Sequence, residues 1–380
     1  MAKKKKSEQE ETEVVEGAEE TKKVVDIDEQ LNEEFGDGVM VSGAFITEQP
    51  QVIIPVSPQI DIMTNGGIPF GSFIIPTGPP KVGKTSTSLD LAATALHIPT
   101  EFENPRHIYY FKVEGRLPPR DLLGIHHLSE YDRVNNMTII QSRLGRILYA
   151  EDYLDIAERL INEKPGSIFI MDSMSQLCSK SRKEKDWQED KAYRDNVPTF
   201  LSNFCKRICQ VIPLNQSLFI GITHQIANTG MGFSAWAESS GNKVQYQVDV
   251  KMHAKFNQPY TIGTEANKIK LGININWECY AAPLQNGQST EKSTSKFRFG
   301  WGLDKHAELI LIAADLRLIN VKGSWYGFKG DNGEDVKAQG LENTRTLLLE
   351  NPKSALRIYK EFRELMGLKA IPETYEHICL

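Results

Sequence analysis

Short apolar runs alternate with helical patterns through most of the chain. Patterns of buried strands occur at 73–75 and within "HIYYFKVEG", "GSIFIMDSMSQL" and "SLFIGITHQ". Helical periodicity runs from residue 84 to about 96 and through "DYLDIAERLINE", between these strands. Strands that alternate with helices predict an α/β fold with a twisted, mostly parallel sheet that helices cover.

The pattern changes near residue 304. A helix in "HAELILIAADL", strands and turns in "NVKGSWYGFKGDNGEDV" and two helices in "ENTRTLLLENPKSALRIYKEFRELM" predict a small α+β unit. We therefore expect an arm at 38–56, a core at 57–303 and a small C-terminal domain at 304–380. The segment "IANTGMGFSAWAESSGN" is too rich in Gly, Ser and Asn to predict a regular element.

Charge separates residues 1–37 from the rest. They hold 6 Lys and 13 Asp or Glu, a net charge of −7, against −6 for the whole chain. Such a segment is typical of a disordered tail, and it could also shield a basic surface from nucleic acid. No apolar run approaches the roughly 18 residues of a membrane helix, and the first lysines are followed by acids instead of an apolar secretory region. We expect a cytoplasmic protein without a membrane partner.

The stretch "GPPKVGKTS" carries the strongest chemical signal. It follows an apolar strand, precedes a helix and matches the pattern G-x-x-x-x-G-K-T of a phosphate-binding loop. Backbone N–H groups and the helix start would bind phosphates, Lys84 would bridge the β and γ phosphates, and Thr85 would complete a Mg²⁺ shell. The predicted nucleotide-binding residues are Gly78, Pro79, Pro80, Lys81, Val82, Gly83, Lys84, Thr85 and Ser86.

Polar residues at the ends of the other strands complete the candidate site. Asp172 ends "IFIMD", where it could orient Mg²⁺ through water. Glu114 ends "IYYFKVE" and is the candidate to position an attacking water, although an exposed strand-end glutamate would look the same. Gln225 is the preferred γ-phosphate sensor, with His224 as its competitor. Carboxyl ends of parallel strands share one edge of a sheet, so these residues should converge.

In their order and spacing, these motifs resemble bacterial RecA and related recombinases. The C-terminal stretch "GSWYGFKGD…GLENTRTLLLENPKSALRIYKEFREL" is similar to the RecA small domain, and the resemblance covers about residues 55–367. It implies an ATP- and Mg²⁺-dependent protein that forms homo-oligomeric filaments on single-stranded DNA, pairs it with duplex DNA and exchanges strands. A single-strand-binding protein and a loader are further implied partners. A compact, divergent chain of this kind resembles the recombinases of large phages, and the expected place is the cytoplasm of a bacterium or of a phage-infected host.

The resemblance also implies roles for individual residues. Glu114 would be the catalytic glutamate, Gln225 the γ-phosphate sensor, and Trp301 with Gly302 the pair that contacts adenine. Two DNA-binding loops are implied at about 179–196 and 226–242. Their candidate DNA-binding residues are Lys180, Arg182, Lys183, Lys185, Lys191, Arg194, Phe233, Trp236 and Asn242. The first loop also holds five acidic residues, so a solvated charged face would look the same.

Some positions depart from the family pattern. Lys112 stands where many relatives have an Asp, and no lysine lies between Leu271 and Leu284, where RecA has lysines that reach the neighbouring subunit's ATP. Lys268 and Lys270 lie farther upstream. The arm at 38–56, with Phe45 as anchor, could pack on a neighbouring core or cover its own. Two alternatives to a recombinase stay open: a hexameric helicase-like motor with a RecA core, and a recombination mediator that binds ATP without hydrolysing it.

Overall fold

A computed structural model describes residues 27–49, 51–183, 196–227, 236–238, 247–263, 267–285 and 292–380. The chain divides into two compact units, Met1–Pro50 and Gln51–Leu380. In the first unit, α1 (Ile27–Phe35) and α2 (Gly43–Glu48) have no buried residues. The helix α1 lies within the stretch that the charge pattern predicts to be disordered. Its Leu, Gln and Glu residues have high helix propensity, which charge content alone does not reveal.

The second unit is built on one large sheet. In the described residues its strand order is β13-β12-β11-β10-β3-β7-β6-β4-β5. The strands are β3 (Phe73–Thr77), β4 (Ile108–Lys112), β5 (Met137–Ile140), β6 (Ile168–Asp172), β7 (Leu218–Gly221), β10 (Val250–Ile262), β11 (Ile269–Ala281), β12 (Lys292–Arg298) and β13 (Gly302–Leu303). Neighbours from β10 to β5 pair in parallel, and β10 to β13 pair antiparallel. The predicted α/β class with a mostly parallel core sheet is confirmed.

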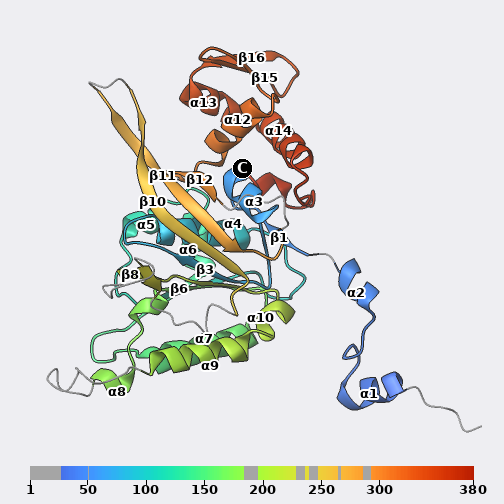
Figure 1. Cartoon of the computed structure of the whole chain (residues 1–380), viewed down its shortest axis with the longest axis vertical. Coiled ribbons are helices and arrows are strands. Elements are labelled where there is room, and N and C mark those ends of the chain that lie inside the picture. The colour runs from blue at the N-terminus through green and yellow to red at the C-terminus, as the bar shows by residue number, and fades with distance from the viewer. Residues whose placement is uncertain are drawn as a thin grey trace, which may run out of the picture. The chain divides into compact units, whose positions relative to one another are not determined.

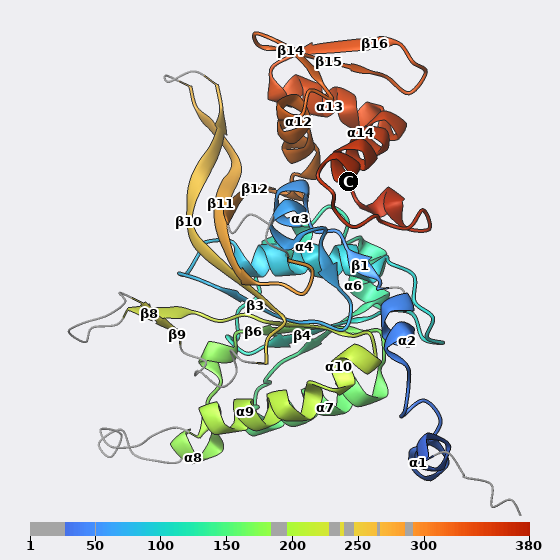
Figure 2. The same cartoon turned by 45° about the vertical axis from the view of Figure 1, so that its right-hand side comes forward.

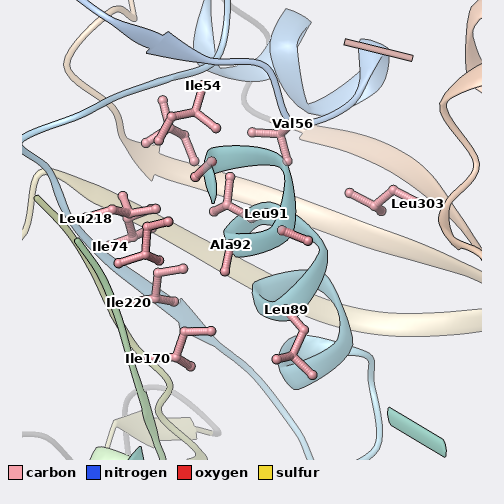
Figure 3. Close-up of a cluster of buried hydrophobic side chains, with 14 of the residues drawn as sticks. Ile54, Val56, Ile74, Leu89, Leu91, Ala92, Ile170, Leu218, Ile220 and Leu303 are labelled. Carbon is pink, nitrogen blue, oxygen red and sulfur yellow. The ribbon is translucent and has the colours of Figure 1, made fainter. Parts of the chain in front are cut away.

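Helices cover both faces of the parallel strands (Figure 1). On β6, Ile168 and Ile170 belong to the core cluster under α4 (Lys84–Leu96), whereas Phe169 and Met171 belong to the cluster under α7 (Ala150–Glu163) and α9 (Val197–Ile208). This alternation is the two-residue period of a strand buried on both sides. Figure 3 shows Leu89, Leu91 and Ala92 of α4 beside side chains of the sheet.

Short elements connect these layers. Before the sheet lie β1 (Ile53–Ile54), α3 (Pro58–Thr64) and β2 (Ile68–Pro69); between β4 and β5 lie α5 (Pro119–Leu123) and α6 (Glu130–Asn135). After β6 come the 3₁₀ turn Met174–Gln176 and α8 (Lys180–Lys183), and α10 (Val211–Leu214) precedes β7. These connections leave the carboxyl ends of the parallel strands at one edge.

Two features differ from the sequence-based expectation. Gln225 does not end the core strand, because β7 stops at Gly221 and Gln225 begins a separate strand, β8 (Gln225–Ala227). This strand pairs antiparallel with β9 (Trp236–Glu238), inside the segment for which no regular element is predicted. Backbone pairing joins β8 to β9, and amino-acid composition does not reveal such pairing. The long β10–β11 hairpin projects beyond the sheet beside the small domain (Figure 2).

The C-terminal α+β unit follows the predicted order. It comprises α12 (Lys305–Asp315), β14 (Asn320–Lys322), β15 (Trp325–Lys329), β16 (Asp335–Gln339), α13 (Leu341–Glu350) and α14 (Pro352–Leu365), with a 3₁₀ turn at Glu376–Ile378. Its apolar core includes Phe328, Leu348 and Phe362. None of the helices in the described ranges combines the length and apolar character that a membrane span requires.

Candidate functional site

The loop between β3 and α4 has the backbone of an anion-binding turn. Gly78, Lys81 and Gly83 all have positive φ, at 146°, 61° and 108°. A Cβ atom on Gly78 would lie 2.3 Å from the carbonyl oxygen of Ala254, and one on Gly83 would lie 2.5 Å from Cδ1 of Ile275. Only glycine therefore fits where the loop packs against β10 and β11. Runs of such residues are typical of loops whose N–H groups converge on an anion.

Lys84 fills the centre of this loop. The residue is 5% exposed, and its Nζ donates hydrogen bonds to the carbonyl oxygens of Gly78 at 2.9 Å and Pro79 at 2.7 Å. Burial lowers the pKa of the Lys84 ammonium to about 8, against the opposing effect of Asp172 and Glu114. The ammonium is thus held in the loop by neutral acceptors, which phosphate oxygens can replace.

A hydroxyl and a carboxylate meet beside the start of α4. Thr85 Oγ1 donates a 2.8 Å hydrogen bond to Asp172 Oδ2, and the hydroxyl of Tyr110 donates to the same oxygen at 2.7 Å. Burial raises the pKa of the Asp172 carboxyl, and these two hydrogen bonds oppose the rise. Hydroxyl and carboxylate oxygens are ligands that Mg²⁺ prefers. The donor set therefore fits Mg²⁺. Sequence reasoning missed Tyr110, which shares no motif with Asp172.

Glu114 lies two residues beyond β4, at the same edge. Ser173 Oγ donates to Glu114 Oε1 at 3.0 Å, and Nε2 of His224 forms a hydrogen bond with the same oxygen. The His224 hydrogen bond lowers the pKa of the Glu114 carboxyl, while burial acts against it. Glu114 is therefore ionised at neutral pH, as a water-positioning base must be. Ser173 comes directly after β6 and His224 three residues after β7, and this position beyond an apolar strand is the signal that could have marked them as its partners.

Gln225 and His224 reach different parts of the site. The backbone N–H of Gln225 donates to the carbonyl oxygen of Gly78 at 3.4 Å, so Gln225 lies beside the loop. The backbone N–H of His224 donates to Ser175 Oγ at 2.8 Å, and its ring reaches Glu114. The structure thus brings together Glu114, Asp172, Lys84, Thr85 and the Gln225 backbone.

Trp301 and Gly302 lie along α4. A Cβ on Gly302 would be 1.9 Å from Oδ2 of Asp90, six residues after Lys84, and that oxygen accepts a 2.8 Å hydrogen bond from Leu303 N. The Trp301 ring stacks on His126 at 3.9 Å, and the Arg345 guanidinium lies 4.6 Å from its centroid. These contacts join the pair to α4 and the small domain. Its role in adenine binding stays a prediction.

The candidate DNA-binding loops follow β6 and β7, which are neighbours in the sheet. Lys180 begins α8 and forms an ion pair with Asp152, with its Nζ 3.0 Å from Oδ1. Of the other candidates, Arg182 and Lys183 are placed in α8, and Trp236 in β9, by their backbones. Lys185, Lys191, Arg194, Phe233 and Asn242 lie outside the described residues.

Lysines from other strands lie beside the part of β11 in which this chain lacks the lysines of the family pattern. Lys255 Nζ is 2.6 Å and Lys292 Nζ 3.4 Å from Glu278 Oε1, so strand pairing brings two cations to the end of β11. Lys270 lies near the opposite end, 5.5 Å from the centroid of the Phe299 ring. At about 3.3 Å per strand residue, roughly 25 Å separates Lys270 from Glu278. Lys270 therefore cannot occupy the position that β11 leaves without lysine.

Together, the strand, loop and helix define an α/β protein with a candidate phosphate-binding loop at the carboxyl edge of its sheet. Comparison with protein families matches residues 307–367 to the RecA C-terminal domain. The chain is 24% identical over 346 residues to Protein RecA of Xanthomonas euvesicatoria pv. vesicatoria, covering 88% of this chain and 91% of that protein.

Two further relatives show the same extent of similarity. Protein RecA of Prochlorococcus marinus (strain NATL1A) is 26% identical over 344 residues, 88% of this chain and 82% of that protein. Protein RecA of Streptomyces ambofaciens is 22% identical over 349 residues, 90% of this chain and 86% of that protein. The chain is thus similar to RecA proteins over 88–90% of its length at 22–26% identity, and its C-terminal part matches the RecA C-terminal domain.

Proposed function

We propose that this protein is an ATP-dependent recombinase that forms filaments on single-stranded DNA and catalyses homologous pairing and strand exchange. The observation that carries the proposal is the convergence of Lys84, the Thr85–Asp172 pair and Glu114 at one sheet edge, in a chain similar to RecA over 88% of its length. ATP and Mg²⁺ are the proposed cofactors. A helical filament of identical subunits is the proposed oligomer. The proposed domains are the core, residues 57–303, and the small domain, residues 304–380.

Each residue at the edge has a proposed chemical role. Lys84 exchanges its carbonyl partners for β- and γ-phosphate oxygens, and the backbone N–H groups of residues 81–86 hold the phosphates. Thr85 and Asp172 would hold Mg²⁺, which neutralises charge on the phosphates when bound. The Glu114 carboxylate orients the attacking water and accepts its proton. His224 fixes the orientation of that carboxylate.

The sensor and the subunit interface follow from neighbouring contacts. Gln225, next to Gly78, would register the γ-phosphate and transmit its presence through β8 to the second DNA-binding loop. Lys255 and Lys292 are proposed to reach the nucleotide of a neighbouring subunit. Both lie beside Glu278, in the part of β11 that has no lysine of its own. In the N-terminal unit, Phe45 is 47% exposed and would anchor the arm on a neighbour.

A strand-exchange assay tests the proposal. Purified protein, ATP, Mg²⁺ and a labelled single strand are incubated with a homologous supercoiled duplex, and joint molecules are separated on a gel. We expect joint molecules with a homologous duplex and none with a heterologous one. Lys84→Ala should abolish them, whereas the exposed Lys322→Ala should not. Duplex unwinding by closed rings would instead indicate a helicase-like motor, and filaments without ATP turnover a mediator.

A further inference from the structure

A cavity of about 240 Å³ lies at the end of α4 that is remote from the phosphate-binding loop. Its walls come from His97 at the C-cap of α4, the segment between α5 and α6, the region around β13, the start of α12 and residues 377–380. A helix of 13 residues is about 20 Å long at 1.5 Å per residue. The cavity therefore lies about 20 Å from the phosphate-binding loop, where the core meets the small domain.

Lys305 provides a buried positive charge in this cavity. The residue is 4% exposed, and its Nζ lies 3.2 Å from Thr94 Oγ1 and 3.5 Å from the carbonyl oxygen of Ile378. Both acceptors are neutral. Within the described ranges no carboxylate forms an ion pair with this ammonium, and Asp61, which interacts with it electrostatically, is already paired with Arg363. Buried ammonium groups are normally compensated by an anion, because burial without one is costly. A ligand with negative charge would supply that compensation.

Imidazoles surround the ammonium. His126 and His377 are exposed at the rim, and His306 is buried in the lining; burial lowers the pKa of the His306 imidazole to about 4, so it is neutral and keeps one N–H donor. Stacking of Trp301 between His126 and Arg345 fixes one wall. Among the residues that line the cavity, none is an aspartate or glutamate.

Two of the lining histidines lie close to carboxylates of the core. Asp132 Oδ2 is 3.6 Å from His97 Nε2, and Asp90 Oδ1 is 3.6 Å from His127 Nε2. A histidine-rich pocket also raises the question of a metal ion. In the part of the chain that the structure describes, no group of three His, Cys, Asp or Glu side chains is arranged to hold one. The lining therefore favours an anion over a metal cation.

We propose that this cavity binds a phosphate-bearing small molecule, either inorganic phosphate or a phosphate monoester with a small organic group. The Lys305 ammonium pairs with the phosphate, and the imidazoles of His306, His126 and His377 donate hydrogen bonds to its oxygens. Because one water occupies about 30 Å³ of liquid, the volume also holds an organic group the size of a small sugar. The ligand would contact both the core and the small domain.

The test is calorimetric titration of the full chain with inorganic phosphate and, separately, with ribose 5-phosphate. The Lys84→Ala variant serves as parent, so that the phosphate-binding loop contributes no phosphate site. We expect one saturable site that Lys305→Gln weakens at least 10-fold and that Lys322→Gln, on exposed β14, leaves unchanged. Tighter binding of ribose 5-phosphate would identify the ligand as an ester, and equal binding as free phosphate. No saturable binding to the parent, or binding unaffected by Lys305→Gln, would overturn the proposal.

A second variant separates ligand binding from folding. His377 is exposed, so His377→Trp should fold normally while its indole fills the mouth of the cavity and leaves Lys305 intact. We expect it to weaken ribose 5-phosphate at least 10-fold, with an unchanged circular dichroism spectrum. Unchanged affinity for both ligands would show that they bind elsewhere. None of these measurements requires ATP hydrolysis or DNA, so they stand apart from the recombinase proposal.

Discussion

The hydroxyl of Thr85 donates a 2.8 Å hydrogen bond to Oδ2 of Asp172, a residue 87 positions later in the chain. Thr85 is the second residue of α4, which follows β3, and Asp172 ends β6; only β7 separates β3 from β6 in the sheet. The parallel order therefore brings the two proposed Mg²⁺ ligands together before any ion binds. Preorganisation of this kind reduces the free energy needed to assemble a metal site.

We expect Asp172→Asn to weaken Mg²⁺-dependent nucleotide binding at least 10-fold. The amide oxygen can still accept from Thr85 and Tyr110, but the negative charge that attracts Mg²⁺ is lost. Titration of a fluorescent ATP analogue with and without Mg²⁺ measures the effect. Asp335→Asn, on an exposed β16 residue, is the matched control. An Asp172→Asn variant with the parent's Mg²⁺ dependence would exclude Asp172 as a ligand.

Nucleotide affinity should fall as the pH rises above about 8. The pKa of Lys84 is lowered by burial to about 8, so the free protein loses the ammonium charge above that pH, whereas bound phosphates favour the charged form. Binding then takes up a proton, and the logarithm of the association constant should decrease by up to about one per pH unit. Calorimetry with ADP at pH 7 to 9.5 in two buffers of different ionisation enthalpy measures both the affinity and the proton uptake. A pH-independent affinity would mean that Lys84 stays charged in the free loop.

The small domain should depend on one buried ion pair. Arg363 Nη1 of α14 lies 2.9 Å from Asp61 Oδ2 of α3, and both side chains are almost inaccessible. Arg363→Met leaves the buried carboxylate without its cation, so we expect a loss of about 3–5 kcal/mol in the free energy of unfolding. Urea denaturation measures it, with Arg357→Met, an exposed residue of the same helix, as control. In the double variant with Asp61→Asn the losses should be less than additive; strict additivity would mean that the pair is not coupled.

Two neighbouring glycines should differ in their tolerance of alanine. Both have positive φ, 73° at Gly300 and 107° at Gly302. A Cβ at Gly300 would meet open space, whereas one at Gly302 would lie 1.9 Å from the Asp90 carboxylate. We expect Gly300→Ala to cost about 1 kcal/mol, the penalty of the left-handed backbone. Gly302→Ala should lower the melting temperature several times more, and equal shifts would contradict the packing of Gly302 on Asp90.

The residues of the proposed phosphate-binding site were easier to predict from the sequence than the residues around them. Lys84, Thr85, Glu114 and Asp172 were predictable because each stands at a fixed place relative to an apolar run, and the chain order alone puts strand ends at one edge. The side chains that form hydrogen bonds with these four residues were not predictable from the sequence. Tyr110 reaches Asp172 only because β4 pairs with β6, with Tyr110 opposite Ile170.

Long-range pairing decides the rest. The 13-residue strands β10 and β11 are interrupted by register shifts and polar residues, so no clean alternation marks them. The cavity around Lys305 assembles from segments more than 200 residues apart, and the scattered histidines that line it form no sequence pattern. Local periodicity identifies elements, but which side chains meet depends on the strand order.

ATP hydrolysis by the parent and by Glu114→Gln, each with and without single-stranded DNA, tests the central claim most directly. The substitution keeps an acceptor for Ser173 but removes the base, so nucleotide binding should persist while turnover falls by 100-fold or more. The account predicts DNA-stimulated hydrolysis in the parent, its collapse in the variant, and filaments on DNA in electron micrographs of both. Hydrolysis that DNA does not stimulate, or that survives Glu114→Gln, would contradict it.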